Sequence, residues 1–255
     1  MKIQVINPNT SLAMTESIGV AARSVARAGT EIVSVCPTFG PASIESYYDE
    51  YLCVPGILDE IRKGEEAKAD AYIIACYGDP GLSAAREVTT KPVIGIAEAS
   101  LSIASILAAR FSIVTVIPRI QTMLEEMVAR YGFRHRVVSI RTTPLYVLDV
   151  EKDPTRALQM LHAEARKAKD EDDAEAILLG CAGFAQFATE LEGDLHIPVL
   201  DGVVCAVKIA EAIVELGKTT SKYKTYRLPE GKAFSGMFAK FGWIDREHKR
   251  KEVSE

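Results

Sequence analysis

The chain has 255 residues, of which 48% are hydrophobic and 25% are charged, as is ordinary for a soluble globular protein. A chain of this length can bury a good core in one large domain or in two smaller ones. The net charge of −5 gives no indication of a nucleic-acid or membrane-surface partner, and no segment approaches the roughly 20 apolar residues of a membrane span.

Targeting and cysteine usage point to a reducing compartment. The opening residues lack the apolar stretch and the small-residue cleavage site of a signal peptide. Five scattered cysteines without a C-x-x-C pair argue against a disulfide framework or a zinc ribbon. The four histidines follow no metal-ligand spacing, so no metal is predicted. We therefore expect a cytoplasmic protein without a metal.

Short apolar runs alternate with Ala-, Glu-, Lys- and Arg-rich segments along the chain. The runs predict strands at Lys2–Ile6, Glu31–Val35, Ala71–Ala75, Pro92–Ile96, Phe111–Ile117, Arg136–Ile140, Ala176–Leu179 and Ile197–Leu200. Segments with helical spacing include Ser11–Ala28, Leu101–Ala109, Thr122–Arg130 and Thr155–Lys169. Nearly continuous Val/Ile/Leu runs are typical of parallel strands covered on both faces. The alternation predicts an α/β fold with doubly wound, mainly parallel sheets, whose ligands bind beyond the carboxyl ends of the strands.

Two segments of the chain are similar to each other in sequence. AYIIACYGDPGL, followed by KPVIGIAEASLSIA, is similar to AILLGCAGFAQF, followed by IPVLDGVVCAVKIA. Cys76 precedes Pro92 by 16 positions and Cys181 precedes Pro198 by 17. Two similar half-domains related by pseudo-symmetry are therefore predicted. We expect one domain at 1–97 plus 208–220, a second at 98–207, and a C-terminal tail at 221–255.

The two cysteines in this repeat follow predicted strands and precede predicted helices. Such a thiol meets free backbone N–H groups and the positive end of a helix dipole, which both favour the thiolate. A free cysteine has a pKa of about 8.5, and a pKa near 7 would make half of it a base. Gly78 and Gly183 let the backbone approach a ligand closely. We therefore predict that Cys76 and Cys181 are functional.

Other residues have plainer interpretations. Cys53 and Cys205 fall among helical residues and are predicted to be structural, as is Cys36, which ends a strand but has no counterpart in the second half. Asp79 precedes a proline and is favoured as a helix cap over a general base. The segment Thr38–Ser43 is either a simple turn or a loop over the site.

The residues IIACYGDPGL, ILLGCAGF and VINPNT, with the tail SKYKTYRLPEGKAFSG, resemble the aspartate/glutamate racemase superfamily, and within it the hydantoin and allantoin racemase branch. The resemblance covers nearly the whole chain. It implies two similar α/β domains facing each other across an active site, a homo-oligomer, and no cofactor. It also implies that Asn9 and Thr10 bind a small-molecule substrate.

Together with the paired cysteines, this resemblance implies a two-base racemase of 5-substituted hydantoins, with allantoin possible. One cysteine removes the C5 proton and the other returns a proton to the opposite face. Backbone N–H groups near Gly78-Asp79 and Ala182-Gly183 are candidate donors to the enolate oxygen.

Three alternatives stay open. Aspartate and glutamate racemases are expected to carry Cys-Asn-Thr and Cys-Thr-His motifs, which this chain lacks. Maleate-type cis-trans isomerases also use a cysteine and are not excluded. The third alternative is a two-lobed binding protein without chemistry, which would not need thiols at equivalent positions of both lobes. Arylmalonate decarboxylases are disfavoured because only one such cysteine is expected in them.

Overall fold

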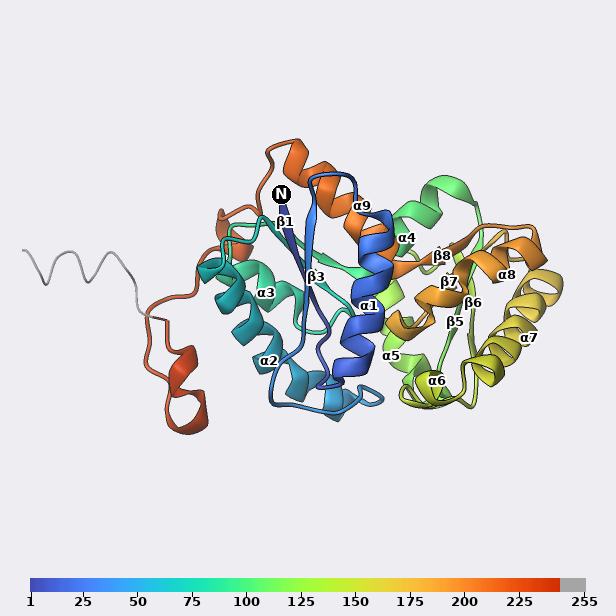
Figure 1. Cartoon of the computed structure of the whole chain (residues 1–255), viewed down its shortest axis with the longest axis horizontal. Helices are drawn as coiled ribbons and strands as arrows, with labels where there is room; N and C mark the ends of the chain where they lie inside the picture. The colour runs from blue at the N-terminus through green and yellow to red at the C-terminus, as the bar shows by residue number, and fades with distance from the viewer. Residues whose placement is uncertain (244–255) are drawn as a thin grey trace, which may run out of the picture.

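Two four-stranded sheets, parallel throughout, form the framework of the molecule (Figure 1). The computed structural model describes residues 1–243. The first sheet has the order β2-β1-β3-β4, with bounds Lys2–Ile6 (β1), Glu31–Val35 (β2), Ala71–Ile74 (β3) and Val93–Gly95 (β4). The second has the order β6-β5-β7-β8, with bounds Phe111–Thr115 (β5), Val137–Thr142 (β6), Ala176–Leu179 (β7) and Val199–Asp201 (β8). The two orders are equivalent, so the predicted pair of similar α/β units is confirmed.

Helices connect the strands. Their bounds are Leu12–Val25 (α1), Tyr47–Glu66 (α2), Leu82–Val88 (α3), Ile96–Leu107 (α4), Gln121–Arg130 (α5), Asp149–Lys152 (α6), Pro154–Asp172 (α7), Ala188–Leu195 (α8) and Gly202–Glu215 (α9). Shorter 3-10 turns lie at Pro118–Ile120 (η1), Ala182–Phe187 (η2), Lys224–Tyr226 (η3) and Gly236–Phe241 (η4). None of the helices in residues 1–243 is long and apolar enough to cross a membrane.

The central strands are buried on both faces, as their apolar composition predicts. Every residue of β3, β5 and β7 is buried, because helices cover both sides of each parallel sheet. Ile74 pairs with Gly95 in the first sheet, and Leu179 pairs with Asp201 in the second. The carboxyl ends of β3 and β7 therefore occupy matching places, and a cysteine follows each of them by two residues.

α4 and α9 join the two halves. α4 packs against β4 but also against β7 and β8, and α9 packs against β3, β4 and β8. The two helices also contact each other between the halves (Figure 1). A side chain at Gly202 would lie 2.7 Å from the Ile96 carbonyl oxygen, so glycine permits this close approach. Because both helices bridge the sheets, the expected division at 97/98 and 207/208 stays a prediction. The last part of the expected tail, 244–255, lies outside the described residues.

Some predicted boundaries were wrong. The strand expected at Pro92–Ile96 ends at Gly95, because Ile96 already begins α4. The helix expected from Leu101 therefore starts one and a half turns earlier. After Cys76, the helix expected at Asp79-Pro80 begins only at Leu82, with Gly81 as its N-cap at φ +66°.

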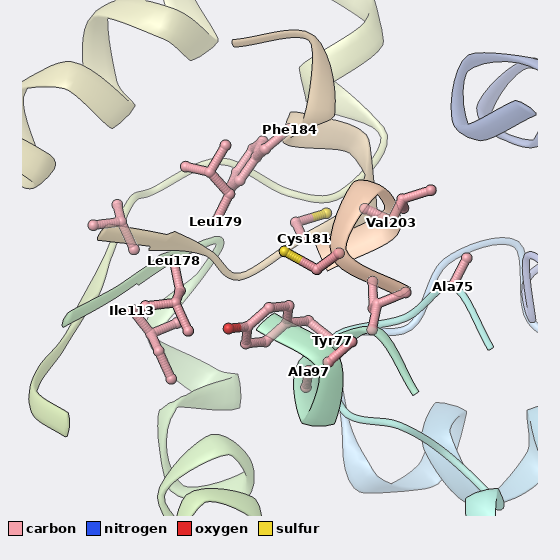
Figure 2. Packing of buried hydrophobic residues seen from close by; sticks show 14 of the residues in the cluster. Ala75, Tyr77, Ala97, Ile113, Leu178, Leu179, Cys181, Phe184 and Val203 are labelled. Carbon is pink, nitrogen blue, oxygen red and sulfur yellow. The ribbon is translucent and has the colours of Figure 1, made fainter. Parts of the chain in front are cut away.

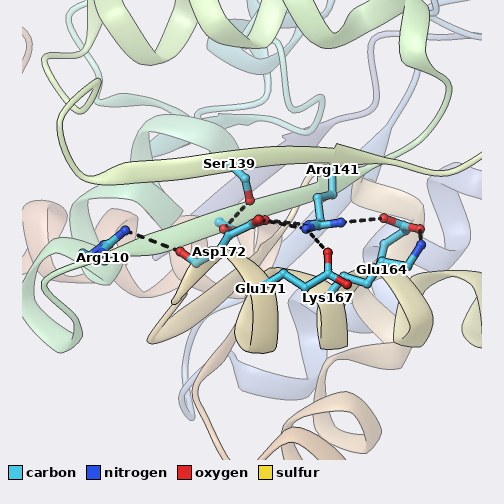
Figure 3. A network of polar contacts seen from close by, with 8 residues as sticks. Arg110, Ser139, Arg141, Glu164, Lys167, Glu171 and Asp172 are labelled. Carbon is cyan, nitrogen blue, oxygen red and sulfur yellow. Dashed lines mark hydrogen bonds and ion pairs between the residues drawn. The ribbon is translucent and has the colours of Figure 1, made fainter.

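In the second half, a network of charged side chains fixes α7 on the outer strand β6 (Figure 3). The Arg141 guanidinium donates to both carboxylate oxygens of Asp172, at 2.6 and 2.8 Å, and to Glu171 at 2.9 Å. These bonds raise the pKa of Arg141. A bidentate arginine–carboxylate pair of this kind has a defined geometry.

Candidate active site

Cys76 and Cys181 line one cavity between the two halves. Cys76 is half-buried and Cys181 is 9% exposed. Figure 2 shows Cys181 of the second half and Tyr77 of the first half within the same apolar cluster. The prediction that the repeat brings both thiols to a common site therefore has a geometric basis.

The cavity wall is mainly apolar. Its apolar side chains include Met14, Ile44, Val116, Ile120, Met123, Leu124 and Val147. Its polar groups come from Asn7, Asn9 and Glu50, beside the two thiols and the backbone of Gly78 and Ala182. The space open to water inside is about 50 Å³, whereas ligand pockets commonly measure ~300–1,000 Å³. The space that is open to water is therefore small compared with a common ligand pocket.

Each thiol accepts a hydrogen bond from the backbone of its own turn. The N–H of Gly78 donates to Cys76 and the N–H of Gly183 donates to Cys181, and each bond lowers the pKa of its cysteine. Burial outweighs them: it raises the pKa of Cys181 to about 11 and raises that of Cys76 well above its usual value. The expectation of cysteines with lowered pKa values was wrong for these buried thiols, because removing a thiolate from water costs more than one backbone donor returns.

Helix placement contributes to this outcome. α3 begins six residues after Cys76, so its positive end is not at the sulfur. Ala182 and Gly183 do open the next element, but that element is the 3-10 turn η2.

Neighbouring negative charges oppose the ionisation of both thiols together. A charge on Cys181 raises the pKa of Cys76, as does Glu50, while Glu45 and Asp201 raise that of Cys181. Two acids that repel in this way lose their protons in separate steps. The state with one thiolate and one thiol is thus favoured over two thiolates.

Asn9 lies in the cavity wall, 3% exposed. Its amide oxygen accepts from Asn7 Nδ2 at 2.7 Å and from the Ser11 N–H at 2.9 Å. Within residues 1–243, its amide nitrogen donates only to the Met14 sulfur, at 3.2 Å, and thioethers are weak acceptors. The oxygen is therefore occupied, and the N–H₂ group is the end of Asn9 available to a ligand.

Three of the predicted site residues do not line this cavity in the described part of the chain. The Asp79 carboxylate points to the start of α4 instead. Thr10 donates from its N–H to the Pro41 carbonyl oxygen at 3.0 Å, which holds the loop after β2. Gly183 acts through its N–H to Cys181. Substrate contact by these residues stays a prediction, whereas Asn9, Gly78 and Ala182 lie on the wall.

The segment after Thr38–Ser43 covers the cavity. Ile44 forms part of its wall, and the Glu45 carboxylate accepts from the Val147 N–H of the second half at 2.7 Å. An outer hollow of about 400 Å³ begins beside Glu45 and is bordered by Arg119 and Tyr146. Glu45 thus joins the segment before α2 to the second half, beside the outer hollow.

Sequence reasoning missed Asn7, Glu50 and Ile44 as wall residues. Asn7 belongs to the NPNT motif, so the sequence contained a signal that could have identified it. Glu50 and Ile44 reach the site only through the packing of α2 and the loop before it, which no local pattern reveals. Cys53 is 0% exposed and Cys205 is 4% exposed, in agreement with their structural interpretation. Cys36 is not among the wall residues, and its structural role stays a prediction.

The fold is that of racemases. An allantoin racemase from Klebsiella pneumoniae superposes with a TM-score of 0.93 at 46% identity, covering 96% of this chain and all of that one. An allantoin racemase from Pseudomonas fluorescens gives a TM-score of 0.89 at 38% identity, covering 92% of this chain and 100% of that one. These similarities define the class as a racemase-type α/β protein with two similar domains.

Sequence comparison narrows the class to a family. The model of the Asp/Glu/hydantoin racemase family matches residues 3–210. A hydantoin racemase from Pseudomonas sp. (strain NS671) is 63% identical over 242 residues, which is 95% of this chain and 97% of that protein. The chain belongs to the Asp/Glu/hydantoin racemase family and is an enzyme of the isomerase class.

Proposed function

We propose that this enzyme racemises 5-substituted hydantoins by moving the C5 proton between Cys76 and Cys181. The observation that carries the proposal is the presence of both thiols, from equivalent turns of the two halves, on the wall of one cavity. Racemisation requires a base on one face of the stereocentre and an acid on the other. Two groups at matching places in facing half-domains meet that requirement without moving around the substrate.

In the forward direction, one cysteine as thiolate removes the C5 proton and becomes a thiol. The C–H electron pair moves into the ring and onto the C4 oxygen, giving an enolate. The other cysteine, a thiol, then donates its proton to the opposite face of C5 and becomes the thiolate. The product is the other enantiomer, and the enzyme is ready for the reverse reaction.

Preorganised donors stabilise the enolate oxygen, and one such donor is typically worth about 10²- to 10³-fold in rate. The free N–H₂ group of Asn9 and the backbone N–H groups at Gly78 and Ala182 are the groups we propose for the ring carbonyls. Asn7 supports this role because it occupies the Asn9 oxygen and so directs the N–H₂ group toward the ligand.

The wall composition supports a neutral ring with an apolar 5-substituent. Ile44, Leu124 and Val147 offer apolar surface, while Glu50 brings a negative charge that would repel a carboxylate substrate. Aspartate, glutamate and maleate therefore fit this wall less well than a hydantoin. Allantoin stays the second candidate, because Glu50 could accept hydrogen bonds from its ureido N–H groups.

We further propose a homo-oligomer that works in the cytoplasm without a cofactor or a nucleic-acid partner. Apolar side chains of the tail support the oligomer: Tyr223, Leu228, Phe234, Met237 and Phe238 are between 43% and 85% exposed. Large exposed apolar side chains gathered on one segment commonly mark a contact surface.

The test is a substrate panel in heavy water, with benzyl- and isopropyl-hydantoin, allantoin, aspartate, glutamate and maleate. We expect the optical rotation of one hydantoin to decay to zero while its C5 proton signal is replaced by deuterium. A protein that binds hydantoins but changes neither signal would contradict the proposal and favour a binding protein. Racemisation of aspartate or glutamate but not of a hydantoin would show that the substrate is an amino acid.

A further inference from the structure

The Asp79 carboxylate, 3% exposed, joins three parts of the molecule. Its Oδ1 accepts from the Ala97 N–H at 3.1 Å, and its Oδ2 accepts from the Glu98 N–H at 2.9 Å. Both donors belong to the first turn of α4. The Tyr131 hydroxyl, which follows α5 in the second half, donates to the same Oδ2 at 2.8 Å. A buried carboxylate with three donors is a firm anchor.

The same residue closes the turn that carries Cys76. The Asp79 N–H donates to the Cys76 carbonyl oxygen at 3.0 Å, and Asp79 has a φ of +50°. Gly78, between them, supplies the N–H that donates to the Cys76 sulfur. One end of this short turn therefore holds the thiol, and the other end is fixed to α4 and to Tyr131. Because α4 packs on β7 and β8, the turn is tied to the second half, where Cys181 follows β7.

The second half caps its helix differently. β7 lies 105 positions after β3, so Phe184 stands where Asp79 stands in the first half, and Asp201 ends β8 as Gly95 ends β4. Asp201 caps α9 itself, accepting from the Val204 N–H at 2.7 Å. A side chain at Gly95 would lie 2.2 Å from the Asp79 carboxyl carbon. An aspartate at position 95 would cap α4 as Asp201 caps α9, so helix capping alone does not require a carboxylate on the cysteine turn.

We propose, on the basis of the two-thiol function above, that Asp79 is a positioning residue that sets where the Cys76 thiol stands relative to the second half. It does not touch the substrate. Its effect is confined to the face of C5 that Cys76 serves, because the Cys181 turn is held instead by the buried Phe184, 0% exposed.

The test separates capping from positioning by moving the carboxylate. The double variant Asp79→Gly, Gly95→Asp reproduces the arrangement of the second half: α4 keeps a cap, the space at position 95 is vacated, and glycine accepts the positive φ at 79. We expect its melting temperature within a few degrees of wild type but its racemisation rate lowered by roughly 10²-fold, the loss that a displacement of about 1 Å can cause. Glu211→Gln is the matched control, since it changes a buried carboxylate, 4% exposed, that accepts from the Arg27 N–H at 2.9 Å and belongs to neither cysteine turn.

The decisive readout is C5 deuterium exchange from each pure enantiomer in heavy water. In the double variant, the enantiomer deprotonated by Cys181 should exchange faster than it racemises, because return to the Cys181 face outpaces delivery from Cys76. The opposite enantiomer should lose exchange and racemisation together. Glu211→Gln should show equal behaviour from both enantiomers.

A double variant with wild-type racemisation, or with equal losses from both enantiomers, would overturn the proposal. If the double variant does not fold, Tyr131→Phe removes one anchor alone, and the same asymmetry is expected at a smaller size; symmetric behaviour there would also overturn it. Failure of the two-thiol function is distinguishable in the single variants Cys76→Ser and Cys181→Ser, because it would appear as racemisation retained in either of them.

Discussion

The turns after β3 and β7 hold equivalent thiols by different means. In the first half, Asp79 fixes the turn through hydrogen bonds to α4 and Tyr131. In the second half, Phe184 takes the corresponding place and is buried in the apolar core (Figure 2). What the two halves share is a cysteine two residues past the central strand, with an N–H two residues later that donates to the sulfur. In the proposed mechanism, the shared features serve the proton transfer, whereas the differing anchors only hold each turn in place.

The largest effect is expected from replacing the thiols that the two halves share. Replacing either thiol, by Cys76→Ser or Cys181→Ser, should lower racemisation by at least about 10³-fold, in keeping with the 10²- to 10⁴-fold worth of a positioned acid or base. A serine hydroxyl is a far weaker acid than a thiol and supplies no base at neutral pH. Polarimetry on a chiral hydantoin gives the rate. Cys36→Ser is the control, since that cysteine also follows a strand of the first sheet but lies off the cavity wall. It should retain activity.

The pKa values give the same prediction a pH dependence. Burial raises the pKa of Cys181 to about 11 and that of Cys76 well above its usual value, so the thiolate fraction of the free enzyme rises with pH. We expect kcat/KM to increase from pH 7 through pH 9 in wild type. A profile that is flat over this range would show that the ionised form is already complete at neutral pH.

The second effect concerns stability and distinguishes the two capping carboxylates, Asp79 and Asp201. Burial raises the pKa of both Asp79 and Asp201 to about 6, above an unfolded value near 3.9. The folded state thus holds more protons between about pH 4 and 6, so the free energy of unfolding falls as pH rises through that window, by up to about 3 kcal/mol per group. Asp201 Oδ2 has no hydrogen-bond partner among residues 1–243, whereas both oxygens of Asp79 are bonded.

Asparagine substitutions should therefore differ in sign at pH 8. Asp201→Asn should raise the free energy of unfolding by about 1 kcal/mol, because it removes a buried charge and costs only an unpaired amide. Asp79→Asn should lower it by about 1–2 kcal/mol, because an amide cannot accept from all three donors. Urea unfolding at pH 8 measures both. Equal destabilisation by the two variants would contradict the contrast.

A smaller effect is expected from breaking the hydrogen bond between Glu45 and Val147, which joins the two halves. Glu45→Ala removes the acceptor for the Val147 N–H and should raise KM roughly 5-fold, equivalent to about 1 kcal/mol of one hydrogen bond. Glu45→Gln keeps a carbonyl acceptor and should restore KM. If both variants raise KM equally, the carboxylate charge rather than the hydrogen bond is responsible.

The smallest effect lies in the second half alone. Arg141→Leu breaks the network between β6 and α7 (Figure 3) and should lower the free energy of unfolding by about 1 kcal/mol, the usual scale for partly exposed charged pairs. The network is remote from the cavity wall, so kcat should not change. A loss of activity at unchanged stability would show a coupling that the contacts do not explain.

Much of the fold could be predicted because its signals are local. Lys2–Ile6, Glu31–Val35 and Ala176–Leu179 are strands with the predicted bounds, since continuous β-branched runs between turn residues have few other solutions. The repeat placed Cys76 and Cys181 at equivalent strand ends without any structure.

The rest depends on distant parts of the chain. Asp79 looked like a cap for the helix after it, but its carboxylate caps α4, whose donors lie 18 and 19 positions away. The thiol pKa values were misjudged because their shift comes mainly from burial, which a strand-end motif does not report. Glu50 and Ile44 enter the wall only when α2 folds over the first sheet.

The measurement that tests the central claim most directly is C5 deuterium exchange in the two single serine variants, starting from each pure enantiomer. Cys181→Ser retains only the Cys76 base, and Cys76→Ser retains only the Cys181 base. We predict that each variant exchanges one enantiomer without inverting it, and that the two variants choose opposite enantiomers. Exchange of the same enantiomer by both variants, or retained racemisation in either, would contradict a proton transfer shared between the two thiols.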